Sequence, residues 1–138
     1  MARTGKAPNR RGLAATELAI LLPFVGLLFM VAVDFCRVYF VTQTLQNSAQ
    51  TAAMFASGTA KSSALVPVEN TAKQMAIADA ASLDPPLKAE NVTVTFDAQT
   101  VTVTIQYEFP MFTTIYAESG KVVLQRKVTV AKAPQPGS

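Results

Sequence analysis

The sequence predicts an α+β fold in which a long N-terminal helix, a short second helix and a small three-stranded antiparallel sheet follow one another. Two changes of pattern carry this prediction. Leu13 to Val33 is an apolar run with a single charge, Glu17, and apolar residues then recur at steps of three and four as far as Ser57, as on one face of a helix. After residue 90 apolar residues alternate with polar ones, which is typical of strands.

The basic residues are concentrated ahead of the apolar run. The chain has 138 residues and a net charge of +3, and residues 1–12 hold four basic side chains and no acid: Arg3, Lys6, Arg10 and Arg11. The rest of the chain has 8 basic and 9 acidic residues, so the excess belongs to this leader. Basic residues beside a span stay on the cytoplasmic side, which predicts an N-terminus inside and a C-terminal domain outside the cytoplasm. A nucleic-acid-binding arm is the weaker interpretation, because no aromatic residue interleaves the basic ones.

Three kinds of segment compete for residues 1–33: a cleaved secretory signal, a plain signal anchor, and an anchor that is cut at its cytoplasmic start. A secretory signal has an apolar region of about 7–15 residues before a cleavage site, whereas this run is longer and continues into a helical pattern. An anchor fits better, because about 20 apolar residues span the hydrocarbon core as a helix. We therefore expect residues 13–33 to form a transmembrane helix.

The residues just before the span favour the anchor that is cut. Arg10-Arg11-Gly12 is followed by Leu13-Ala14-Ala15-Thr16-Glu17, so a cut between Gly12 and Leu13 makes Glu17 the fifth residue of the mature chain. This pattern resembles the recognition sequence of prepilin peptidases. Because glycine has no side chain, its backbone can enter a tight protease site.

Glu17 needs an explanation of its own, since a carboxylate at the centre of a membrane costs about 2.5–3.5 kcal/mol. One interpretation is that Glu17 lies a turn inside the bilayer and extends to the interface. The other is that it pairs with a positive group, which in pilin-like assemblies is the new α-amino group of a neighbouring subunit. Gly12 at the matching distance favours the second interpretation.

The helical pattern continues beyond the membrane as an amphipathic extension over residues 34–58. Asp34 and Arg37 are three residues apart and share a helix face. Gly58 is expected to end the helix, and Lys61-Ser62-Ser63 beyond it to form a loop.

Small residues and a proline modify this helix. Pro23 removes a backbone donor, which predicts a kink or local melting, and Gly26 lets another helix approach closely. A small-residue face in the extension is suited to close packing, either on the chain's own domain, which is at least as good an interpretation, or on a second subunit: Ala49, Ala52, Ala53 and Ala56.

Residues 59–131 are expected to form the extracytoplasmic α+β domain. Its short helix is predicted over residues 67–83 and ends at Asp84-Pro85-Pro86, because proline disfavours helix for the residue before it. One stripe of this helix is apolar: Ala72, Met75, Ala76, Ala80 and Leu83. The hairpin loop is predicted at Asp97 to Thr100, and residues 132–138 are expected to be disordered. The three predicted strands are Val92–Phe96, Val101–Phe109 and Val122–Ala131.

The sequence offers little for catalysis. With no histidine and one cysteine, the chain contains no Ser-His or Cys-His couple and no common zinc site. We therefore expect no enzyme activity, no cofactor and no metal. Cys36 is interpreted as a small buried hydrophobe, with a bond between subunits as the alternative. Asp97 and Glu108 lie near strand ends and could meet, but we interpret them as solvated surface residues.

Three segments resemble TadE-like proteins, which are minor pseudopilins of tight-adherence (Tad, type IVc) pilus systems related to type IV pili. The similarity runs to about residue 60 and is carried by Arg10 to Phe24, Val33 to Tyr39 and Gln43 to Ala49. Tyr107 to Phe112 and Val122 to Val130 resemble the family's later strands less specifically. Asp34 departs from the glutamate more often expected there and keeps its charge.

The resemblance implies a pilin-like fold, cleavage by a prepilin peptidase and insertion in a bacterial inner membrane. The partners that it implies are other pilin-like subunits and the Tad inner-membrane assembly proteins. It also implies a role in starting or tipping a pilus, with incorporation in it as a further expectation. The charge distribution, in turn, leads us to expect no contact with nucleic acid. The alternative function is a signal-anchored extracytoplasmic binding module with no place in a filament.

Overall fold

The computed structural model describes residues 10–59, 68–112 and 120–132. Within these ranges the chain forms α1 (Arg10–Thr59), α2 (Val68–Asp79), the short 3-10 helix η1 (Ala89–Asn91), and the strands β1 (Val92–Phe96), β2 (Thr100–Pro110) and β3 (Lys121–Ala131). The predicted α+β architecture is confirmed. The expectations for the leader residues Arg3 and Lys6, for the loop at 61–63 and for a disordered tail at 133–138 lie outside the described residues.

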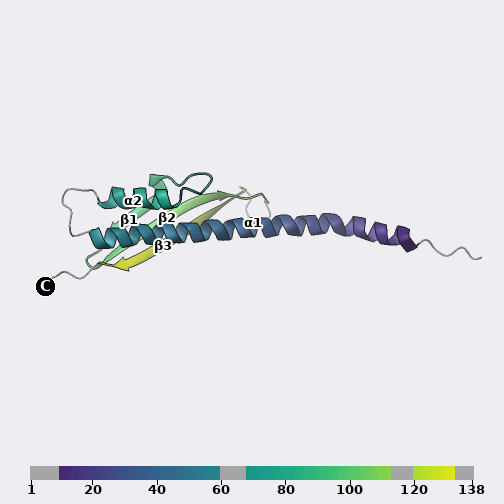
Figure 1. Ribbon diagram of the computed structural model, residues 1–138, viewed down its shortest axis with the longest axis horizontal. Helices are drawn as coiled ribbons and strands as arrows, with labels where there is room; N and C mark the ends of the chain where they lie inside the picture. The colour runs from purple at the N-terminus through teal and green to yellow at the C-terminus, as the bar shows by residue number, and fades with distance from the viewer. Residues whose placement is uncertain (1–9, 60–67, 113–119, 133–138) are drawn as a thin grey trace, which may run out of the picture.

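The 50 residues of α1 make it about 75 Å long at 1.5 Å per residue. Its N-terminal half projects alone and its C-terminal half carries the rest of the fold (Figure 1). The helix begins at Arg10, three residues before the predicted start at Leu13, and ends at Thr59, one residue beyond Gly58. It continues through Pro23 without interruption, so local melting is not seen there, and the kink stays a prediction.

The three strands form one antiparallel sheet in the order β1-β2-β3. Val94 pairs with Val103, which pairs with Val128 on the other side, so their apolar faces align. The hairpin loop is one residue shorter than predicted, because Thr100 already belongs to β2 and pairs with Ala131.

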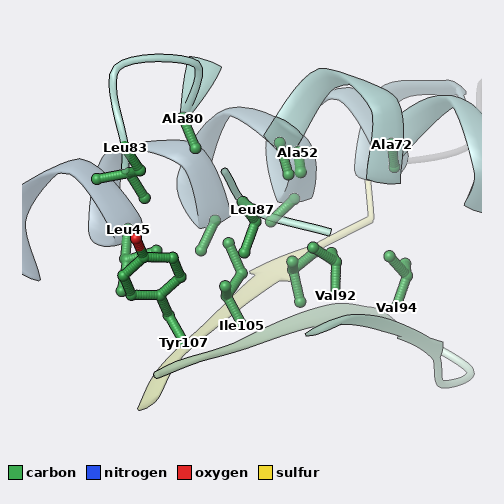
Figure 2. Close-up of a cluster of buried hydrophobic side chains, with 14 of the residues drawn as sticks. Leu45, Ala52, Ala72, Ala80, Leu83, Leu87, Val92, Val94, Ile105 and Tyr107 are labelled. Carbon is green, nitrogen blue, oxygen red and sulfur yellow. The ribbon is translucent and has the colours of Figure 1, made fainter. Parts of the chain in front are cut away.

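Both helices lie on the same face of the sheet, and the hydrophobic core fills the space between the helices and the sheet (Figure 2). Leu45 of α1 and Ile105 of β2 are fully buried there. The small-residue face of α1 is fully buried as well, which confirms that it packs on the chain's own domain: Ala49, Ala52, Ala53 and Ala56. Without bulky side chains at these positions α1 comes close to α2 and to the strands, and the valines and Ile105 of the sheet fill the remaining volume.

The second helix is shorter than the predicted 67–83. After Asp79 the chain forms a turn in which the amide of Leu83 donates to the carbonyl of Ala80 at 3.0 Å. The turn brings Ala80 and Leu83 into the core, so the predicted apolar stripe is buried although its end is not helical. Met75 is the exception, since it is 38% exposed.

Replacement of Leu45 tests whether the core holds the domain on α1. We expect Leu45→Ala to lower the free energy of unfolding by about 2–5 kcal/mol, because it leaves a cavity at a fully buried position. The measurement is urea unfolding of the full chain in mild detergent, followed by tyrosine fluorescence. Met54→Ala is the matched control on the same helix, since Met54 is 53% exposed. Equal losses in the two variants would contradict this account of the core.

Candidate functional site

The N-terminal half of α1 exposes its apolar side chains on all sides. Every residue from Gly12 to Met30 is exposed, including Phe29 at 71% and Leu18 at 63%. Among the described residues α1 is the one helix long and apolar enough to cross a membrane, with a mean hydropathy of 2.5 over its most apolar stretch. Only 6% of that stretch is buried, whereas the core helix of a soluble domain would be mostly buried. The apolar run is therefore available to a membrane or to other proteins.

Glu17 is exposed on this half of α1, and it forms no ion pair with any side chain that the structure describes. It lies five residues after Gly12, about 7.5 Å further along the helix axis. The side chains of Arg10 and Arg11, which belong to the same region, lie outside the described atoms.

The bond between Gly12 and Leu13 lies inside the first turns of α1, where the sequence predicted the leader to meet the helix. A Cβ atom placed on Gly12 would meet nothing within 4 Å, so the backbone is open to approach. The Thr16 hydroxyl donates to the Gly12 carbonyl at 3.0 Å. An enzyme that cut this bond would have to unwind this turn, and helix starts unwind readily because their first amide groups have no partner in the helix.

A buried carboxylate marks the point where α1 meets the domain. Asp34 is 1% exposed, and its Oδ1 accepts a hydrogen bond from the backbone amide of Phe112 at 3.1 Å. The Arg37 guanidinium lies 3.5 Å from the same oxygen, which confirms that the two residues share a helix face. The guanidinium also lies over the rings of Phe112 and Phe109, at 4.0 Å and 4.8 Å from their centroids. We call Asp34, Arg37, Phe109 and Phe112 the exit clamp.

Sequence reasoning found half of the exit clamp and missed the rest. The spacing of Asp34 and Arg37 gave their pairing, but nothing in the sequence linked them to Phe112, 78 residues further on. The phenylalanines on both sides of Pro110 were a weak signal, since aromatic rings are frequent partners of arginine.

One interpretation was wrong, and another is confirmed. Cys36 is exposed, not buried. It follows Asp34 by two residues, which is about 200° around a helix, so burial of Asp34 turns Cys36 outward. Asp97 and Glu108 do not meet: Asp97 lies in the hairpin at one end of β2, and Glu108 pairs with Lys121 at 3.3 Å near the other end. Both acids are exposed, as interpreted from the sequence.

Two further polar contacts hold the domain together above the clamp. The Ser48 hydroxyl of α1 donates to the Asp79 carboxylate at the end of α2, at 3.1 Å. The Tyr107 hydroxyl donates to the carbonyl of Pro85 at 2.6 Å. Burial raises the pKa of the Tyr107 phenol above its ordinary value of 10.0, and the negative charge of Asp84 raises it further. Within the described ranges no three acidic, histidine or cysteine side chains gather as metal ligands would.

Removing the Asp34 carboxylate tests the exit clamp. We expect Asp34→Ala to lower the free energy of unfolding by about 1–3 kcal/mol, because the Phe112 amide loses its acceptor. Asp34→Asn keeps an acceptor oxygen and loses the charge, so it should cost less. The measurement is urea unfolding in detergent, with Glu90→Ala as the control, since Glu90 is an acid whose side chain is 73% exposed. A loss no larger than that of the control would rule out the clamp.

The raised pKa of Tyr107 predicts a pH dependence. The folded-state pKa exceeds the unfolded one, so the stabilisation is complete below pH 10.0 and is lost as the pH rises through the folded value. We expect Tyr107→Phe to remove this part of the alkaline fall in the free energy of unfolding. Circular dichroism during urea unfolding at pH 8 and pH 11 would measure it. Tyr39→Phe, at a residue 60% exposed, should keep the wild-type fall. Identical pH profiles for wild type and Tyr107→Phe would refute the prediction.

Comparison with known proteins gives one match. Residues 12–54 match the family model described as TadE-like protein, which confirms the resemblance predicted from the sequence. The match begins at Gly12 and ends within α1, so the weaker resemblance of the strands lies outside it. No curated protein and no solved structure matches the chain.

Proposed function

From the match of residues 12–54 to the TadE-like family, we propose that this protein is a minor pseudopilin of a Tad (type IVc) pilus and not an enzyme. It would be held in a bacterial inner membrane by α1, with its N-terminus in the cytoplasm and its α+β domain outside. A prepilin peptidase would cut between Gly12 and Leu13, and the mature chain would act in starting or tipping the pilus. The observation that carries the proposal is that the matched segment begins at Gly12 and covers the exposed apolar half of α1.

The orientation rests on charge. The four basic residues of the leader precede the span and favour the cytoplasm. The domain follows the span directly, since Asp34 is the first buried residue of α1. Only 16 residues, none of them charged, separate Glu17 from Asp34, so the chain crosses the membrane once in this stretch.

The assembly role rests on groups that have no ion pair or close packing within the described part of the chain. Glu17 forms no ion pair with a described side chain and is exposed on an apolar helix surface. Cleavage at Gly12 would create an α-amino group, and this group on a neighbouring subunit is the cation that Glu17 would meet. A buried pair of this kind fixes the register of neighbours more than it adds stability. A Cβ on Gly26 would meet nothing within 4 Å, so packing within the chain does not require this glycine, whereas close approach of another helix would.

The experiment is the intact mass and N-terminal sequence of the chain from its native membrane, with and without the prepilin peptidase. We expect a mature chain that begins at Leu13 only when the peptidase is present. Gly12→Phe should leave the full chain in both strains, whereas Gly26→Phe is the control that should still be cut, because it lies within the span. An intact N-terminus in both wild-type strains would refute the proposal and favour a signal-anchored binding module.

Glu17 separates processing from assembly. We expect Glu17→Gln to be cut normally and to lose pilus formation, since the charge is absent from the interface between subunits. Glu69→Gln is the matched control, because Glu69 lies on α2 in the domain and pairs with Lys73. Normal piliation in Glu17→Gln cells would exclude the assembly role of this residue.

A further inference from the structure

A groove of about 500 Å³ lies where the apolar half of α1 meets the domain. One wall is α1 from Phe29 to Val41, the other is Ser82 to Asp84 beyond α2, and Phe109 of β2 also lines it. The volume falls within the roughly 300–1,000 Å³ that is typical of small-molecule sites. The groove is outside the leader and the Glu17 region, which the proposed function uses.

The lining of the groove changes character along α1. Phe29, Ala32 and Val33 lie at its lower end, toward the N-terminal half of the helix, and all three are apolar. Its two charged residues are Arg37, one turn of α1 further on, and Asp84 on the opposite wall, and apolar side chains continue past Arg37 at Phe40 and Val41. A molecule that fits this lining has an apolar part along Phe29 and Val33 and a part with both charges beside Arg37 and Asp84.

Arg37 in the groove falls at the level of lipid headgroups. This step rests on the proposed function, which ends the span at Val33. Arg37 follows Val33 by four residues, about 6 Å along the helix, and the headgroup layer is roughly 5–8 Å thick on each side of the hydrocarbon core. Two exposed aromatic side chains lie on one face of α1 at about the same level, Phe35 at 73% and Tyr39 at 60%, and aromatic residues are enriched at membrane interfaces.

We propose that the groove binds a phospholipid with a zwitterionic phosphoethanolamine headgroup. The acyl chain lies along Phe29 and Val33, the phosphate accepts hydrogen bonds from Arg37, and the ammonium group meets the Asp84 carboxylate. The Arg37 side chain is 33% exposed, and Asp34 and the Phe112 ring hold it in place. Its guanidinium carries five N–H donors, so it can bind a phosphate beside Asp34.

Two other occupants fit less well. An anionic lipid such as phosphatidylglycerol brings the phosphate for Arg37 but no ammonium group for Asp84. A second copy of the chain at the same depth would bring its own Asp34 and Arg37 to this level, where they already pair with each other. Only the zwitterionic headgroup supplies an opposite charge for both Arg37 and Asp84.

Native mass spectrometry of the full chain in detergent tests the proposal, with equal amounts of dioleoyl phosphatidylethanolamine and dioleoyl phosphatidylglycerol. We expect the wild type to retain the ethanolamine lipid about fivefold more, which is the effect of one partly exposed charge pair. Asp84→Asn should bring this ratio close to one. Asp97→Asn is the matched control, an exposed aspartate in the β1–β2 hairpin, and should keep the wild-type ratio.

A second pair of variants tests the acyl part without touching a charge. Ala32→Phe fills the lower groove and should reduce retention of both lipids about fivefold, whereas Ala19→Phe adds the same bulk outside the groove and should not. Equal retention of the two lipids by the wild type, or equal effects in a variant and its control, would overturn the proposal. The proposal would also be overturned if the wild type formed disulfide-linked dimers through Cys36 and Ala32→Phe abolished them while keeping its lipid. The groove would then hold another subunit.

The outcome is separable from the proposed function. Peptidase-dependent maturation of the same variants is measured in cells. Normal maturation without lipid preference overturns the groove proposal alone. Lipid preference in a wild-type chain that is never cut overturns the pseudopilin proposal and leaves the groove site supported.

Discussion

Asp34 lies at the boundary between two parts of α1 that have different surroundings. From Gly12 to Met30 every residue of the helix is exposed, and from Val41 to Ser57 buried residues recur at steps of three and four against the domain. Asp34 is 1% exposed, and its carboxylate contacts both Arg37 and the amide of Phe112, two residues beyond the end of β2. Because β2 pairs with both other strands, this contact sets where the whole sheet stands along the helix.

The two halves of α1 have different surroundings, so each half has its own limits on side-chain size. The C-terminal half of α1 needs alanines where α2 and the sheet approach it, since larger side chains would push the helices and the sheet apart. The apolar half has no such limit within the chain, and its exposed residues are large: Leu18, Ile20, Leu22, Phe24 and Phe29 are all at least 60% exposed. Membrane lipid or neighbouring helices must cover these side chains, because such a surface is not stable in water.

Local patterns predicted most of the fold. The change from helical to alternating periodicity located α1 and all three strands within a few residues, because side-chain periodicity depends directly on backbone geometry. The end of α2 was misplaced, since apolar spacing continues through a turn that buries Leu83 as a helix would. Cys36 was misplaced because the face that the domain covers depends on Asp34, and a buried aspartate is not expected from composition. The groove joins residues 29–41 with residues 82–84 and 109, and no local pattern contains that contact.

The spacing of charges on α1 bears on the two interpretations of Glu17. From Glu17 to Arg37 is 20 residues, about 30 Å of helix, which equals the thickness of the hydrocarbon core. If Arg37 lies about 6 Å outside the core in the outer headgroup layer, Glu17 lies about 6 Å inside the inner boundary, one helical turn, and not at the bilayer centre, where a carboxylate costs about 2.5–3.5 kcal/mol. Insertion energy alone therefore does not require a partner for Glu17. The need for a partner would arise if the span left the lipid for a filament, where a carboxylate between apolar helices would have no headgroup layer to reach and a cation would have to come from a neighbour.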